Sequence, residues 1–346
     1  MRARLIPLLS TSSALPGDFR KPAAHLEGSR DQWVDIARGI GIILVVWGHV
    51  LRANFTLINS PWAKAQDQLI YSFHMPLFFL LAGLFVWPNL ARGRAKFLRG
   101  RWSAVIWPYL LWSLVSGLIA LALSGYVNTP IHWHDLVSIP ISPIEQYWFL
   151  YALLICQLAC VTAYPSYIRL LVVGIAGYLS LNLIGGVWIG IRAFLYLPFV
   201  TVGVMGARKL NVVSTSSLTQ IVALAGSGVF VLGVSLWKSA EFGPTYLLFL
   251  ISGMGGSFAC VGLAMFIARR WKAELLASLG RASLAIFVLH TIFSAGVRIA
   301  LRLAGCAPSS AVSVGSAFVL GLYLPWMIFQ QVQSLGFSKA LGVSGR

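Results

Sequence analysis

Long apolar runs, each about the length of a membrane-spanning helix, dominate this sequence. A bilayer core about 30 Å thick needs roughly 20 apolar residues per helix. About ten runs approach that length, and they fall near residues 36–54, 69–87, 103–124, 146–163, 168–186, 188–205, 217–236, 244–267, 282–301 and 311–331. Because 58% of the residues are hydrophobic and only 10% are charged, too few polar side chains remain to solvate a water-soluble domain. We therefore expect an all-α polytopic membrane protein with about ten transmembrane helices.

The positive charge of the chain is spread between these apolar runs. A formal net charge of +17 in a soluble protein would suggest a nucleic-acid partner. Here the basic residues are scattered, and connections on one side of the predicted membrane carry about three times as many as those on the other. Positively charged connections stay in the cytoplasm. Both termini are therefore expected there, and no nucleic-acid partner is expected.

A single membrane domain is expected over residues 31–335. Residues 1–30 hold only a short apolar stretch between arginines, which predicts a disordered cytoplasmic leader rather than a secretory signal. Residues 336–346 are expected to form a short cytoplasmic tail. The HxHD cluster at 132–135 is a weak metal signal by itself, and the cysteines lack paired metal spacing, so no metal site is expected.

The stretch 35-DIARGIGIILVVWGHVLR-52 is an apolar run with ionisable residues at both ends. A charge at mid-bilayer costs roughly 2.5–3.5 kcal/mol on insertion scales, so such residues are functional candidates unless they pair or reach an interface. Asp35 and Arg38 are three residues apart and can pair on one helix face. His49 follows Arg38 by eleven residues, which is about 16 Å and close to three turns along a helix. Arg38 and His49 are therefore expected at opposite ends of one face.

Two further histidines lie in predicted spans. His74 opens the apolar run 71-YSFHMPLFFLLAGLFVWP-88, in which Pro76 either bends or begins the helix. Because the first two spans run in opposite directions, His74 is expected at about the depth of His49, with both imidazoles facing one pocket. His290 lies about halfway along a later run, where a lone histidine can also simply bond a neighbouring helix.

The connection 92-RGRAKFLRGRWSAVIWPYLLW-112 begins with five basic residues in ten positions. Two interpretations stay open. The connection is either a topogenic loop that touches anionic lipid, or a binding patch for an anionic cytosolic cofactor. In the second case Lys96, Arg99 and Arg101 are the candidate contacts.

In this order the motifs resemble those of the acyltransferase 3 family of bacterial integral-membrane O-acyltransferases, including its fucose 4-O-acetylase-like and polysaccharide O-acetyltransferase members. The resemblance covers residues from about 31 to about 331. It rests on 35-DIARG-39 followed by His49, on 72-SFHMPLFFLLAG-83, on the basic connection that runs into Pro108 and Tyr109, on 147-YWFL-150 and on 280-GRASLAIFVLH-290.

The resemblance implies transfer of an acyl group, usually acetyl from cytosolic acetyl-CoA, to a hydroxyl of an extracytoplasmic or lipid-linked glycan. An exopolysaccharide or O-antigen sugar is the first choice of acceptor. Acetyl-CoA is then a cosubstrate, and no cofactor is held permanently. Membrane lipid, the glycan and polysaccharide-assembly proteins are the expected partners. The protein is expected to be a multi-pass protein of the bacterial cytoplasmic (inner) membrane.

The resemblance also implies catalytic roles. Arg38 and His49 match the arginine and the histidine of the first helix that activity requires in the family. We expect His49 to be a general base, with a nucleophilic role through an acyl-imidazole as the alternative. His74 is expected to orient His49 or to stabilise the oxyanion, and Asp35 to hold Arg38.

Binding roles follow in the same way. Arg38, Lys96, Arg99 and Arg101 are the expected acetyl-CoA contacts, although Ala104 stands where the family often has a second arginine three residues after Arg101. Glu145, Trp148 and His290 are expected to contact the acceptor.

Other functions stay open for a protein of this kind. A transporter or flippase of a lipid-linked saccharide would suit buried polar groups, but repeated halves with matching broken helices are not visible. A membrane glycosyltransferase would normally need an acidic pair in an outer loop, and residues 53–68 offer only Asp67. A noncatalytic member of a polysaccharide-synthesis complex is disfavoured by the paired histidines.

Overall fold

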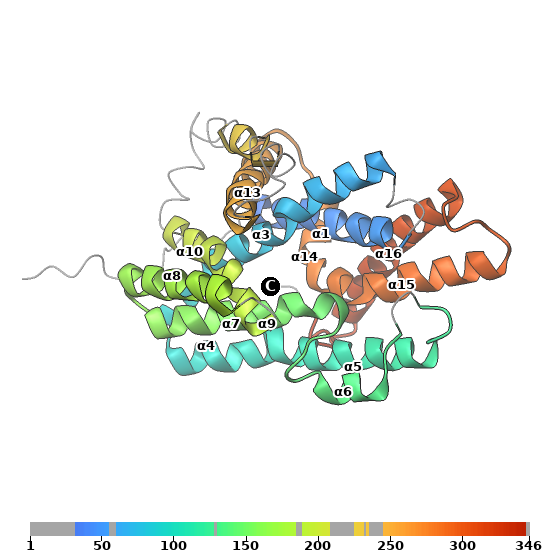
Figure 1. The fold of residues 1–346 in the computed structure, drawn as a ribbon, viewed down its shortest axis with the longest axis horizontal. Helices are drawn as coiled ribbons and strands as arrows, with labels where there is room; N and C mark the ends of the chain where they lie inside the picture. Colours follow the sequence, from blue (N-terminus) through green and yellow to red (C-terminus); the bar gives the residue numbers. More distant parts are fainter. Residues whose placement is uncertain are drawn as a thin grey trace, which may run out of the picture.

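The computed structural model describes residues 32–54, 60–127, 130–184, 189–207, 225–231, 233–234 and 245–343. Its regular elements in these ranges are helices, as Figure 1 shows. They are α1 (Gln32–Arg52), α3 (Pro61–Ala91), α4 (Arg94–Arg101), η2 (Trp102–Ile106), α5 (Trp107–Ala122), α6 (Trp133–Ser138), η3 (Glu145–Tyr147), α7 (Trp148–Ala163), α8 (Tyr167–Ile184), α9 (Ile189–Arg192), η4 (Ala193–Leu195), α10 (Leu197–Gly206), α13 (Thr245–Arg270), α14 (Glu274–Arg281), α15 (Ser283–Leu303) and α16 (Ala311–Ser334). The leader expected over 1–30 lies outside the described residues.

Seven helices of the described chain are long and apolar enough to cross a membrane. They are Gln32–Arg52, Pro61–Ala91, Arg94–Ala122, Glu145–Ala163, Tyr246–Arg270, Ser283–Leu303 and Ala311–Ser334. Two shorter apolar helices, Tyr167–Ser180 and Ala193–Gly206, coincide with predicted spans. The span predicted near 217–236 lies mostly outside the described residues. The all-α polytopic membrane fold is confirmed, while the total of about ten crossings stays a prediction.

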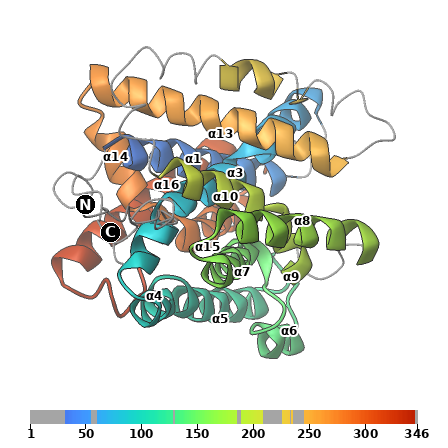
Figure 2. The ribbon, with the colours of Figure 1, turned by 90° about the vertical axis from the view of Figure 1, so that its left-hand side faces the viewer.

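Helices α1 and α3 occupy the middle of the molecule. In both ribbon views they lie between α13 on one side and α5 on the other (Figures 1 and 2). Helices α14, α15 and α16 contact α1, and α7 and α10 contact α3. Large side chains such as Ile42, Phe79 and Phe199 are fully buried at this junction. The two elements that carry the predicted catalytic histidines are thus surrounded by packed helices.

Helix α3 begins earlier than the apolar pattern predicts. Ser60 caps its N-terminus by accepting a hydrogen bond from the backbone N–H of Ala63, and Pro61 occupies the first turn. These two signals extend the helix through a polar segment before the apolar run. His74 therefore lies about 20 Å from the start of the helix rather than near it. Pro76 lies inside the helix and does not begin it.

The backbones of α1 and α14 approach each other closely at two glycines. A Cβ atom on Gly39 would lie 2.1 Å from the carbonyl oxygen of Leu276, and one on Gly280 would lie 1.7 Å from the carbonyl oxygen of Asp35. Neither position has room for a side chain, and both neighbouring atoms belong to the backbone. The crossing therefore requires glycine on both helices, and it fixes the end of α1 that carries Asp35 and Arg38.

The segment after α16 folds back onto α5. Trp107 Nε1 donates a hydrogen bond of 2.7 Å to the carbonyl oxygen of Ala340, and Trp112 Nε1 donates one of 2.9 Å to that of Leu341. Val343 is buried. Residues 336–343 of the predicted tail are therefore packed against a helix of the domain.

Replacing Gly280 with alanine is expected to destabilise the fold by about 1–3 kcal/mol, because the new methyl group collides with the backbone of α1. Thermal unfolding of the detergent-solubilised protein measures the loss. The matched control is Gly315→Ala in α16, where a Cβ atom meets nothing within 4 Å and alanine favours the helix. Equal melting temperatures for the two variants would contradict the close crossing.

Candidate active site

One face of α1 carries ionisable groups near both of its ends. Arg38 Nη1 lies 3.9 Å from Asp35 Oδ1, so the two form an ion pair three residues apart. The Asp35 side chain is only 3% exposed, whereas that of Arg38 is 24% exposed. Arg38 also lies over the ring of Phe85, 5.6 Å from its centroid. The buried carboxylate thus holds a guanidinium that keeps part of its surface accessible.

A cavity of about 160 Å³ begins at this arginine. Its wall includes Arg38 and Ile42 of α1, Met75 and Phe78 of α3, Phe149 of α7 and Phe287 of α15. Apart from Arg38 and Ser283, the lining side chains are apolar. Met75 directly follows His74, and Phe287 precedes His290 by one turn. The lining thus includes close sequence neighbours of His74 and His290, while the three histidines themselves are not part of it.

The rings of His49 and His290 contact each other. Their ring centroids are 4.9 Å apart, and the rings are inclined by 65°. His290 is fully buried, whereas His49 is partly accessible. His290 Nδ1 lies 2.8 Å from the carbonyl oxygen of Phe287 and 3.0 Å from that of Ile286. Because a carbonyl oxygen only accepts, Nδ1 must carry the proton and Nε2 of the neutral ring is an acceptor.

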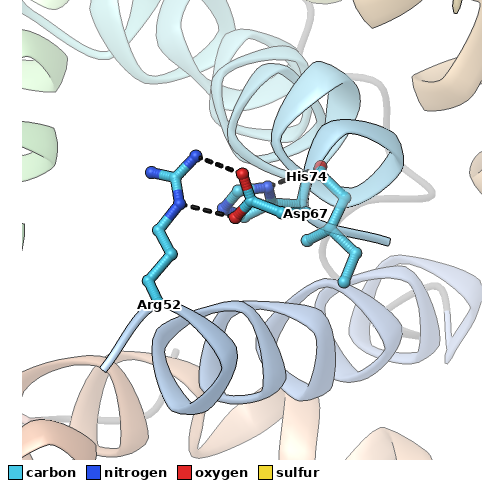
Figure 3. A network of polar contacts seen from close by, with 4 residues as sticks. Arg52, Asp67 and His74 are labelled. Carbon is cyan, nitrogen blue, oxygen red and sulfur yellow. Dashed lines mark hydrogen bonds and ion pairs between the residues drawn. The ribbon is translucent and has the colours of Figure 1, made fainter. Parts of the chain in front are cut away.

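His74 lies in a second polar cluster, drawn in Figure 3. Its Nδ1 donates to the carbonyl oxygen of Ile70 at 2.7 Å, and its ring packs edge-on against Tyr71 with centroids 4.7 Å apart. The guanidinium of Arg52 lies over the Tyr71 ring, 3.1 Å from the ring centroid. Arg52 also holds both carboxylate oxygens of Asp67, at 2.5 and 3.0 Å.

Tyr71 connects this cluster to the first pair of histidines. Its ring lies so close to Gly48 that a Cβ atom there would be 2.9 Å from the ring carbon Cε2. Gly48 directly precedes His49. His74 is thus separated from the His49 segment by one tyrosine ring, and the structure brings His49, His74 and His290 to the same end of α1.

The basic connection forms a helix whose arginines and lysine face different surroundings. Arg101 is buried, donates to Gln157 of α7 at 3.3 Å and lies over the ring of Phe97. Lys96 and Arg99 are exposed. The π-helix η2 follows at Trp102–Ile106, and Ala104 within it lines the cavity. The connection therefore runs from an exposed basic surface to the cavity wall.

The predicted acceptor residues at the start of α7 point in different directions. Glu145 is exposed and has a φ of 43°, a conformation that is uncommon outside glycine. Trp148 packs on Tyr196, with ring centroids 5.3 Å apart. Gln146 and Tyr147 between them are buried, and they were not expected to belong to the site.

The HxHD cluster has a local structural role. The side chain of Asp135 accepts from the backbone N–H of His132 in a capping box of the short helix α6. The ring of His134 is exposed beside Asp135, at 3.3 Å.

Comparison with known proteins matches the acyltransferase domain of the Acyl_transf_3 family to residues 31–330. The chain belongs to the acyltransferase 3 family. Among curated relatives, the nodulation protein NolL of Sinorhizobium fredii is 33% identical over 150 residues, which are 41% of this chain and 39% of that protein. NolL of Mesorhizobium japonicum is 29% identical over 136 residues, which are 36% and 33%. The matched stretch thus spans less than half of either relative. No solved structure matches the chain.

The histidine cluster and the cavity are the candidate active site of this acyltransferase 3 family member. Sequence reasoning missed Arg52, Asp67 and Tyr71 as part of that cluster. A signal was present, because the chain has only nine acidic residues and one of them, Asp67, lies seven positions before His74. Helix periodicity alone could not pair Asp67 with an arginine on another helix.

Replacing Arg52 with lysine is expected to lower the acyl-transfer rate about tenfold, because an ammonium cannot hold both Asp67 oxygens while covering Tyr71, and small misplacements slow catalysis. Transfer assays on membranes with matched protein levels measure the change. The exposed Arg302 on α15 offers the control substitution Arg302→Lys, which should leave the rate unchanged. An unaltered rate in Arg52→Lys would show that the cluster does not position the histidines.

Proposed function

We propose that this protein is an O-acetyltransferase of the bacterial inner membrane, which moves an acetyl group from cytosolic acetyl-CoA to a hydroxyl of an extracytoplasmic or lipid-linked glycan. An exopolysaccharide or O-antigen sugar is the proposed acceptor, and polysaccharide-assembly proteins are the proposed neighbours. The observation that carries the proposal is the arrangement along α1. Arg38 lines an apolar cavity, and His49, eleven residues later on the same helix, packs against His290. The family match supports group transfer rather than the transport of a saccharide.

The proposed binding site for acetyl-CoA combines Arg38 at the cavity with the basic residues of the connection 92–101. Arg38 and Arg101 would hold the anionic phosphates of acetyl-CoA, since guanidinium groups bind phosphate through paired hydrogen bonds. Lys96 and Arg99 on the exposed face of α4 would attract the nucleotide electrostatically. Arg38 and His49 are separated by about 16 Å along α1, a distance that the extended arm of the coenzyme can span. Asp35 fixes Arg38 through its ion pair.

The chemical step follows from the position of His49. Its imidazole removes the proton from the acceptor hydroxyl, and the oxygen attacks the thioester carbonyl to form a tetrahedral intermediate. The C–S bond then breaks, the acetyl group stays on the oxygen as an ester, and the coenzyme A thiolate takes the proton back from His49. The apolar lining of the cavity keeps competing water from the thioester.

His74 acts in this proposal as a positioning residue. Its Nδ1–H is held by the carbonyl of Ile70, so its neutral ring offers only an acceptor at Nε2. An acceptor orients a neighbouring N–H group, whereas an oxyanion needs a donor. Of the two roles considered for His74, we therefore propose orientation of the base, exerted through Tyr71, whose ring lies between His74 and the His49 segment.

Replacing His49 with alanine is expected to lower the transfer rate by about 10²–10⁴-fold, which is the usual contribution of a general base. In a strain lacking the gene, the wild type should restore the O-acetyl content of a surface glycan and His49→Ala should not. The control is His134→Ala, which alters an exposed ring on α6. Full acetylation by His49→Ala at normal membrane levels would overturn the assignment. Trapping an acetyl group on His49 would replace the base by an acyl-imidazole.

Replacing Arg38 with glutamine is expected to raise the KM for acetyl-CoA by about tenfold or more, because a charge-assisted contact to phosphate is lost. Steady-state kinetics with purified protein in lipid vesicles measure this value. Arg302→Gln removes an equal charge from an exposed position and should leave the KM unchanged. Unchanged acetyl-CoA dependence in Arg38→Gln would place the donor elsewhere.

A further inference from the structure

The short turn η3 before α7 places Gln146 against α15, the helix that carries His290. Tyr147 is fully buried, its hydroxyl donates to the carbonyl oxygen of Val288 at 2.9 Å, and it lies 2.6 Å from Ser116 Oγ. These contacts anchor the turn on α15. The left-handed backbone of Glu145 precedes it and allows the chain to turn inward. Gln146 is consequently 97% buried, since only 3% of its surface is exposed.

Among the described residues, the side-chain amide of Gln146 is bonded through its nitrogen but not through its oxygen. Its Nε2 donates to Thr291 Oγ1 at 2.8 Å, and Thr291 directly follows His290. Its buried Oε1 has no hydrogen-bond partner among the described residues. Buried polar atoms are nearly always satisfied, so an orphaned one marks a place where another group binds.

His290 presents the same feature at the next position. Both carbonyl contacts engage its Nδ1, and its buried Nε2 has no hydrogen-bond partner in the part of the chain that the structure describes. Two neutral acceptors, Gln146 Oε1 and His290 Nε2, are therefore buried on neighbouring elements, and the ring of His290 packs against His49. A ligand that satisfies both must bring hydrogen-bond donors.

Both acceptors lie about one helical turn in sequence from residues that line the cavity. Phe149 and Leu150, which line it, follow Gln146 by three and four residues, and Phe287 precedes His290 by three. The Phe287 and His290 rings are 6.3 Å apart. Residues one turn away from both unpartnered acceptors thus line the cavity, and His290 also packs against the reactive His49.

The chemistry of the two acceptors selects hydroxyl groups as their partners. An anion brings lone pairs rather than protons and would be repelled. An ammonium group would have to leave water for a cavity that is otherwise apolar and already carries the charge of Arg38. A hydroxyl donates a proton without carrying charge, and adjacent hydroxyls of a sugar ring can reach two neighbouring acceptors.

We infer that Gln146 and His290 form a subsite for hydroxyl groups next to the one that reacts, so that the enzyme takes a polyhydroxylated acceptor and esterifies one position of it. This inference rests on the proposed acyl transfer. Gln146 is then a specificity-determining residue that holds the acceptor and leaves the donor untouched. A lone alcohol would be a poor acceptor because it leaves both buried acceptors unpaired.

The test is a kinetic comparison of Gln146→Met with the wild type in lipid vesicles. Acetyl-CoA is the donor, and methyl glycosides of common hexoses and their monodeoxy derivatives are the acceptors. The variant is expected to raise the acceptor KM by about 10- to 100-fold and to leave the acetyl-CoA KM unchanged. Gln330→Met, which removes an exposed amide at Ser278, is the matched control and should change neither value.

The deoxy acceptors make the test independent of the variant's folding. Removing one hydroxyl adjacent to the reacting position should weaken wild-type kcat/KM by a similar factor, and the same removal should matter little in Gln146→Met, because the contact is already lost. Wild-type protein that acetylates every monodeoxy acceptor equally well would overturn the subsite while leaving the proposed function intact. Wild-type protein that transfers acetyl to no hydroxyl acceptor would overturn the proposed function itself.

Discussion

The contact of α1 with α14 determines where both ends of the candidate site lie. Arg38 and His49 belong to one rigid helix, so their separation is set by the helical rise, and their surroundings are set by what packs against that helix. Gly39 and Gly280 let the two backbones approach closely, which fixes the end of α1 whose Arg38 lines the cavity. The neighbouring α15 then presents His290 to the other end of α1. Gly39 and Gly280 thus permit the close helix crossing on which the position of Arg38 depends.

The three buried or half-buried imidazoles differ in the freedom that their surroundings leave them. His74 and His290 each donate Nδ1–H to carbonyls one turn earlier in their own helices, so their rings have a fixed orientation and a fixed acceptor. His49 is the one of these three residues that is not fully buried. A proton carrier must change its hydrogen-bond partners during a reaction, while its neighbours must not. This division fits one reactive histidine supported by two that stay in place.

Local sequence patterns predict much of the fold but only part of the candidate site. The lengths of the apolar runs predict the helices, and the spacing of Arg38 and His49 predicts their common face because both lie on one helix. Arg52 with Asp67, and Gln146 with Thr291, pair across different helices, and such pairs depend on tertiary packing that sequence spacing does not encode. The early start of α3 was readable from Ser60 and Pro61, but the polarity of the following segment concealed it.

The segment after α16 also constrains the order in which the domain can assemble. Trp107 and Trp112 receive their carbonyl partners from residues 233 and 229 positions later in the chain. During synthesis these indole groups can bond to those carbonyl oxygens only after α16 has been made. The helix that continues the basic connection therefore reaches its final environment late. The packing around Trp107 and Trp112 is consequently completed only when the last described residues have been made.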